Sequence, residues 1–175
     1  MDQNKEATNL LEHDRVQQVL ESSPLLLRQF SPEEFRKFLL CGELEEYDAG
    51  ETIVSEKDDL THSGWMIAEG SVSLFKEDVF IARLQAGDFI GETFLFKRRA
   101  PSHTLVATRP TAVIRFDREP VLNFFNNRPD RLFKIFIVNL IDLQNQKLVY
   151  AGKKILYLQR KLMFQTNSSN DGIFE

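Results

Sequence analysis

The side chains that most often ligate metals or attack substrates are few in this chain: His13, His62, His103 and the single cysteine, Cys41. A metal site needs such residues at short, repeated spacing, and these histidines lie far apart in the sequence. The sequence also lacks a Gly-x-Ser-x-Gly elbow and a phosphate-binding P-loop. A lone cysteine is most often a small buried apolar residue. We therefore expect no catalytic residue, no metal site and no enzymatic activity.

A second polar group lies in the middle of the chain, where Gly91 and Glu92 are followed by Arg98, Arg99 and His103. Glycine supplies turns that need a positive φ. An acidic residue at the start of a helix is stabilised by the helix dipole without any ligand. The arginines and the histidine are equally consistent with a solvated loop. On the residue types alone, this group requires no bound molecule.

The elements that would position this group are short strands. Between Leu44 and Phe116, polar and apolar residues alternate in short runs, separated by turn residues such as Asp48-Ala49-Gly50 and Glu77-Asp78. Alternation with a period of two is typical of half-buried strands. About eight such strands at regular spacing predict a sandwich, a jelly roll or a barrel.

Helices are expected on both sides of the strands. Ser31 as N-cap and Pro32 at the first helical position begin a helix, and Gly42 is expected to end it. A short helix follows the last strand, and a long one is predicted from about Asp130 to Phe164. The predicted fold class is α+β: an antiparallel β-roll or jelly roll flanked by N-terminal helices and a long C-terminal dimerisation helix.

The expected organisation has four parts: an N-terminal helical extension (1–24), a β-roll with short flanking helices (25–128), the long helix (129–164) and a flexible tail (165–175). No apolar run is long enough to cross a bilayer, and the polar N-terminus is not a signal peptide. These features predict a cytoplasmic protein without a membrane partner. The net charge of −4 is unfavourable for DNA, which is bound by a surplus of Lys and Arg.

Five segments within residues 25–145 together resemble the cyclic nucleotide-binding domain family. This family includes the catabolite activator protein, regulatory subunits of protein kinase A and cyclic nucleotide-gated channels. The segments occur in the family's order and at its spacing: Leu27–Glu34, Tyr47–Ile53, Met66–Val72, Leu84–Glu92 and Ala112–Glu119. The resemblance implies a regulatory β-roll whose ligand is cAMP or cGMP, with no other cofactor.

The resemblance also implies a phosphate-binding cassette that begins at Gly91 and Glu92. In the family, backbone N–H groups bind the phosphate, the Glu accepts a hydrogen bond from the ribose, and an Arg about ten residues later pairs with the phosphate. An ungapped alignment places Pro101 at the Arg position, and proline has neither charge nor N–H. Loss of that ion pair weakens binding by about one to two orders of magnitude.

The resemblance implies two sets of contacts. The candidate ligand-binding residues are Gly91, Glu92, Arg99 (if the loop bulges), Ser102, His103 and Thr104. The candidates for contacts with the base, by their position on the long helix, are Asn139 and Gln144.

Residues repeat every seven positions along the predicted long helix. One position holds Ile141, Leu148, Ile155 and Leu162, and the interleaved position holds Gln144, Ala151 and Leu158. This repeat is typical of the seam of a parallel coiled coil, and the alternative is an amphipathic helix that packs on its own domain. Resemblance to dimeric bacterial members of the family favours a homodimer.

Several functions stay open at this point. The first is a module that senses cAMP or cGMP and relays it to an unknown protein partner through a dimeric C-terminal helix. The second is a degenerate module that has lost the nucleotide and acts as a protein-interaction dimer. A third is a truncated transcription regulator, since members that bind DNA continue into a helix-turn-helix domain and this sequence ends at Glu175.

Overall fold

The structure is a computed structural model that describes residues 19, 21, 24–58, 62–95 and 101–170. The chain divides into two compact units, Met1–Asn139 and Leu140–Glu175. The first ten residues of the long helix lie in the first unit. The predicted division between residues 128 and 129 stays a prediction. Most of the predicted extension 1–24 lies outside the described residues.

Eight strands and five helical segments make up the described elements. In chain order they are η1 (Leu25–Leu27), α3 (Pro32–Leu39), β1 (Gly42–Tyr47), β2 (Thr52–Val54), β3 (Ser63–Glu69), β4 (Ser71–Lys76), β5 (Val79–Gln85), β6 (Phe89–Ile90), η2 (Glu92–Leu95), β7 (Thr104–Ala107), β8 (Thr111–Asp117), α4 (Arg118–Asn126) and α5 (Asp130–Asn170).

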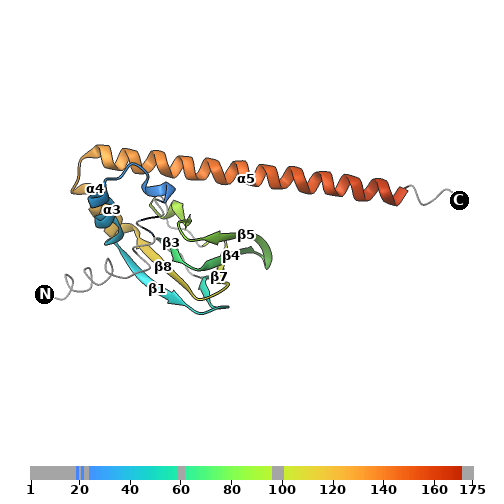
Figure 1. Ribbon diagram of the computed structural model, residues 1–175, viewed down its shortest axis with the longest axis horizontal. Helices are drawn as coiled ribbons and strands as arrows, with labels where there is room; N and C mark the ends of the chain where they lie inside the picture. The colour runs from blue at the N-terminus through green and yellow to red at the C-terminus, as the bar shows by residue number, and fades with distance from the viewer. Residues whose placement is uncertain (1–18, 20, 22–23, 59–61, 96–100, 171–175) are drawn as a thin grey trace. The chain divides into compact units, whose positions relative to one another are not determined.

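The strands form two four-stranded antiparallel sheets, with the orders β1-β8-β3-β6 and β2-β7-β4-β5 (Figure 1). The predicted α+β jelly roll is thus confirmed. The turn predicted at Glu77 and Asp78 is also present. It joins β4 to β5, which pair as an antiparallel hairpin, and both turn residues have positive φ. That conformation matches the right-handed twist of the two strands.

Helix α3 begins as the sequence predicts but does not end as predicted. Ser31 and Glu34 form a capping box, and Pro32 occupies the first turn. The helix ends at Leu39, and Gly42 is the first residue of β1. A Cβ at Gly42 would overlap a side-chain carbon of Ile114 and would lie 2.9 Å from the carbonyl oxygen of Arg115. Glycine is needed here because β1 packs closely against β8, and not because the helix ends there.

A hydrophobic cluster of one tryptophan and six aliphatic residues accounts for much of the first unit's core among the strands. Its buried members come from both sheets and are Val54, Trp65, Ile67, Val72, Leu74, Leu105 and Val113. Burial of this apolar surface is the main driving force for closing one sheet over the other.

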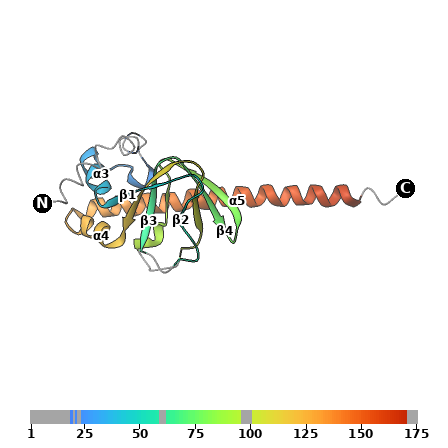
Figure 2. The same ribbon diagram turned by 90° about the horizontal axis from the view of Figure 1, so that it is seen from below.

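A second cluster consists of phenylalanines and joins the sheets to the helices. Figure 2 shows α3 and α4 together at one end of the roll. Phe38 of α3 is fully buried, and its ring lies 5.0 Å from that of Phe116 in β8 and 5.5 Å from that of Phe136 in α5. Its ring also contacts those of Phe124 and Phe125 in α4. Many of the 15 phenylalanines therefore serve packing.

Helix α5 continues to Asn170, six residues beyond the predicted end at Phe164, and the flexibility of the tail 165–175 stays a prediction. Residues 165–170 are polar but include neither Gly nor Pro, so nothing in their sequence interrupts the helix. Among the described residues, no helix is long and apolar enough to cross a membrane.

Candidate functional site

The predicted cassette begins at a sharp corner between β6 and η2. Gly91 has a φ of +85°, which L-residues with side chains rarely adopt. A Cβ at this position would lie 2.9 Å from the carbonyl oxygen of Ser63 and 3.1 Å from the Cα of Gly64. Gly91 is therefore required both by its backbone conformation and by its close approach to β3.

Glu92 is the first residue of η2, and its side chain is buried, with an exposed fraction of 6%. The two aromatic residues on either side of the corner, Phe89 and Phe94, are also buried, and their rings lie 6.1 Å apart. Arg118 of α4 donates a hydrogen bond of 3.0 Å from Nε to the carbonyl oxygen of Leu95. Leu95 is the last residue of η2, so this bond gives its carbonyl group a hydrogen-bond partner. The corner is thus held firmly by its surroundings.

The segment after η2 lies partly outside the described residues. Arg99 falls in the gap 96–100, so its predicted role in phosphate binding stays a prediction. Pro101, at the position where the family places its Arg, is half-buried.

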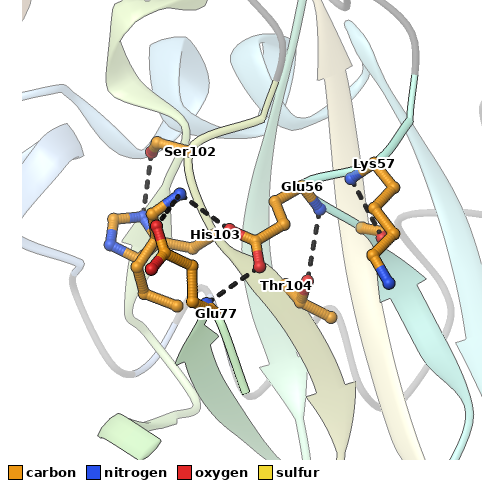
Figure 3. A network of polar contacts seen from close by, with 8 residues as sticks. Glu56, Lys57, Glu77, Ser102, His103 and Thr104 are labelled. Atoms are coloured by element: carbon orange, nitrogen blue, oxygen red, sulfur yellow. Dashed lines mark hydrogen bonds and ion pairs between the residues drawn. The ribbon is translucent and has the colours of Figure 1, made fainter. Parts of the chain in front are cut away.

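The three candidate residues after Pro101 belong to a polar network at one end of the sheet β2-β7-β4-β5 (Figure 3). The Oγ of Ser102 lies 2.8 Å from Nδ1 of His103. The Oγ1 of Thr104 accepts a hydrogen bond of 3.2 Å from the backbone N–H of Glu56, just after β2. The structure therefore places these residues together, beside a segment 48 positions earlier in the chain.

Glu56 is the centre of that network. Its carboxylate accepts from Nζ of Lys76 at 2.8 Å and from the backbone N–H of Glu77 at 2.9 Å (Figure 3). These hydrogen bonds, the one from Lys76 first, hold the pKa of Glu56 below its ordinary value, and the nearby charge of His103 adds to the effect. The network fastens the segment after the cassette to the β4–β5 hairpin.

Sequence reasoning missed Glu56 and Lys76. Each lies at the end of a strand in a polar run, where nothing distinguishes it from an ordinary surface residue. Only the pairing of β7 with both β2 and β4 brings them beside Thr104.

The two candidates for base contacts have different surroundings. Asn139 is 1% exposed, and its Nδ2 donates to the carbonyl oxygens of Leu26 at 3.2 Å and Arg28 at 2.6 Å. These bonds tie the start of α5 to η1, so the amide nitrogen already has a structural role. Gln144 is half-buried and lies in the second unit. Contact of either residue with a base stays a prediction.

Two of the open pockets in the first unit are lined entirely by described residues. One of about 190 Å³ borders Asn139 and is lined by Gln29, Arg131, Lys134, Ile135 and Val138. The other, of about 240 Å³, is lined by Glu46, Tyr47, Asp48, Glu51, Pro110 and Thr111, none of which is a predicted site residue.

The single cysteine and the metal-ligating residue types have the following surroundings among the described residues. Cys41 is half-buried, and burial raises the pKa of its thiol to about 11, which leaves it protonated and unreactive at neutral pH. Within the described part of the chain, no group of three or more His, Cys, Asp or Glu side chains is placed to hold a metal.

The predicted seam residues are exposed in the second unit. Ile141, Leu148, Ile155, Leu158 and Leu162 have exposed fractions between 47% and 70%. Ala151 is also exposed, and Gln144 is half-buried. The side chains of the predicted coiled coil are thus available to a second molecule, and whether they bind one stays a prediction.

Comparisons with known proteins agree with this geometry. Residues 44–128 match the family model of the cyclic nucleotide-binding domain. No match was found among curated protein sequences.

Solved structures with the same fold include the catabolite activator protein of Thermus thermophilus, with 25% identity and a TM-score of 0.64 over 77% of this chain. This chain spans 63% of the length of that protein. A cyclic nucleotide-binding domain from Methylobacillus flagellatus is 20% identical, with a TM-score of 0.69 over 85% of this chain and 93% of that one. The sensor domain of the transcriptional regulator DNR from Pseudomonas aeruginosa is 18% identical, with a TM-score of 0.59 over 77% and 92%. The segment 44–128 therefore matches the cyclic nucleotide-binding domain, and the elements around it complete the fold of these solved structures.

Proposed function

We propose that this protein is a non-enzymatic, cytoplasmic regulator that binds cAMP or cGMP at the corner Gly91–Glu92 and signals to a partner protein through an α5 homodimer. The observation that supports nucleotide binding best is the corner itself. Gly91 has the positive φ and the close contact with β3 that fix the turn, and the buried Glu92 carboxylate follows at the position where family members bind the ribose.

A continuous series of packed rings supports the relay from the corner to α5. Phe89 lies 6.1 Å from Phe116, Phe116 lies 5.0 Å from Phe38, and Phe38 lies 5.5 Å from Phe136 at the start of α5. Close-packed side chains have few alternative arrangements, so a displacement at Phe89 requires its neighbours to move. The rings thus offer a physical route by which occupancy of the corner changes the position of α5.

The dimer is supported by the exposure of the seam. Leu148, Ile155 and Leu162 recur every seven residues and each is more than half exposed. Apolar side chains repeated in this way gain most when they interdigitate with a second copy of the same helix.

Calorimetric titration of the full chain with cAMP and with cGMP tests nucleotide binding. We expect saturable binding to one of them and a melting temperature that rises with ligand concentration. Glu92→Gln keeps the shape but removes the charge, so it should weaken binding about tenfold or more. Glu33→Gln, a change in an exposed acid of α3, is the matched control and should leave binding unchanged. No heat and no thermal shift at millimolar nucleotide would contradict the proposal.

A second function is favoured by one specific observation, the proline at position 101. If the missing Arg has abolished binding, the protein is a protein-interaction dimer that retains the fold without the nucleotide. Pro101→Arg separates the two possibilities. It should strengthen existing binding about tenfold to a hundredfold under the first proposal, whereas under the second the wild type shows no binding for the variant to strengthen.

A further inference from the structure

The proline at position 101 gives Ser102 a larger share in holding a phosphate. Pro101 has neither a charge nor an N–H, so it offers no donor to an anion. Ser102 follows directly and is exposed, and its hydroxyl is the first side-chain donor that the structure describes after the gap 96–100. The direction in which this hydroxyl donates its single proton therefore decides how well the segment can hold a phosphate oxygen.

The hydroxyl of Ser102 is hydrogen-bonded to a group that titrates. Its Oγ lies 2.8 Å from Nδ1 of His103 (Figure 3). A neutral imidazole has one nitrogen that donates and one that accepts, and a hydroxyl has one proton to donate. When Nδ1 carries no proton, Ser102 must donate to it. The hydroxyl oxygen then presents only lone pairs to its surroundings, and these repel an anion.

Protonation of His103 reverses this hydrogen bond. In the imidazolium ion both ring nitrogens carry protons, so Nδ1 becomes the donor and the Oγ of Ser102 becomes the acceptor. The hydroxyl proton is then available to a phosphate oxygen. The same step adds a positive charge at the neighbouring residue. Both changes favour the binding of an anion.

The charged groups around His103 support its protonated form. The carboxylate of Glu56, just after β2, interacts with the charge of His103. That attraction acts on both partners, so Glu56 stabilises the imidazolium ion. Lys76 at the end of β4 lies beside the same carboxylate, since its Nζ is 2.8 Å from Glu56 and 3.8 Å from Glu77. Two carboxylates and one ammonium group leave one net negative charge, which does not oppose a positive charge on the ring.

We propose that His103 is a positioning residue that makes nucleotide binding depend on pH through the hydroxyl of Ser102. The neutral ring carries its proton on Nε2 and takes the hydroxyl as a donor to Nδ1, whereas the imidazolium ion leaves the hydroxyl proton to the phosphate of cAMP or cGMP. This inference rests on the proposed function, because it concerns the regulation of the same site. An ordinary imidazole ionises near pH 6.5, so the change falls between about pH 5.5 and about pH 8.

Calorimetric titration of the full chain with cAMP and with cGMP, at about pH 5.5, about pH 6.5 and about pH 8, tests the pH dependence. The Kd of wild type should rise at least about tenfold from the lowest to the highest pH, because a charge-assisted hydrogen bond to phosphate is lost. Phosphodiesters and ordinary carboxylates stay largely ionised over this range. Equal binding at all three pH values would overturn the inference and leave the proposed function intact. No binding at any pH would contradict both.

Two variants and one control assign the effect to the pair. His103→Ala removes the acceptor, so binding should change less than about threefold with pH and at about pH 8 should be at least as tight as in wild type. Ser102→Ala should also reduce the pH effect to less than about threefold, which the charge of His103 alone supplies. His62→Gln changes the other described histidine and should keep the wild-type profile. Weaker binding of His103→Ala at every pH would show a direct contact or a structural role and would overturn the inference.

Nitrogen-15 NMR of the imidazole gives a readout that needs no ligand. At about pH 8, Nδ1 of His103 should have the chemical shift of an unprotonated, hydrogen-bonded nitrogen and Nε2 that of a protonated one. The signals are assigned by their loss in His103→Ala, and Ser102→Ala should shift Nδ1 toward the value of a nitrogen without a hydrogen bond. A neutral ring with its proton on Nδ1 would refute the inference, because Ser102 would then be the acceptor at every pH.

Discussion

The two units of the chain differ in how far their large apolar side chains are exposed. In the first, Phe38, Ile114 and Leu105 are 2% exposed or less, because strands and helices of the same chain enclose them. In the second, Leu148, Ile155 and Leu162 are more than half exposed. The first unit buries most of its apolar side chains in its own core, although Val79 and Val138 are more than half exposed. The second presents a regular stripe of exposed apolar side chains.

The largest loss of stability is expected from a substitution in the phenylalanine cluster of the first unit. Phe38→Ala removes a ring that contacts five other phenylalanine rings, so unfolding free energy should fall by about 3–5 kcal/mol. Urea unfolding of the wild type and of the variant measures this fall in free energy. Leu148→Ala is the control from the second unit and should change the unfolding of the roll little. A loss below about 1 kcal/mol for Phe38→Ala would mean that the cluster is not the core.

The next effect concerns the seam. Leu148→Asp with Ile155→Asp places two charges per chain where a dimer would bury them, at a cost of about 3 kcal/mol or more. Light scattering should then give the mass of a monomer, 20.3 kDa, while the circular dichroism of the strands is retained. If the mass of the variant equals that of a dimeric wild type, the two copies associate through another surface.

A substitution at the corner of the candidate site is expected to lower the stability of the fold less than a substitution in the core. Gly91→Ala forces a side chain into a φ of +85° and into the backbone of β3, which should cost about 2–3 kcal/mol. Gly50→Ala has a similar φ of +92° but nothing within 4 Å of the added carbon, so it should cost only about 1 kcal/mol. Thermal unfolding of both variants isolates the contact with β3. Equal losses would show that Gly91 is required only for its φ.

The smallest effect is expected at the polar network, and it depends on pH. The folded-state pKa of Glu56 is lowered by Lys76 and by the N–H of Glu77. Its ionised form therefore stabilises the fold above the ordinary pKa of 4.5, and this contribution is lost as pH falls through the lower folded-state value. The difference in stability between wild type and Glu56→Gln should shrink from pH 7 to acid. A difference that stays constant would exclude the carboxylate charge as its cause.

Much of the fold follows from local patterns in the sequence. Ser31, Pro32 and Glu34 are neighbours in the chain, so the capping box can be read directly from their spacing. The alternation of the strands, the Glu77–Asp78 turn and the heptads of α5 depend on the same short range. The corner at Gly91 and Glu92 was found by resemblance to a family, and its close contact with Ser63 was not visible in the sequence.

What the sequence determined by itself is therefore the order of the helices and strands and which face of α5 is apolar, although it placed Gly42 at the end of α3 and not in β1. Only the tertiary structure decided that Glu56 meets Thr104 across 48 positions, that Asn139 bonds to Leu26 across 113, and that Gly42 is needed for close packing of β1 on β8. The physical reason is that periodicity and capping act within a few residues. Contacts between distant segments arise only when strand pairing and core burial together repay the entropy of closing the loops between them.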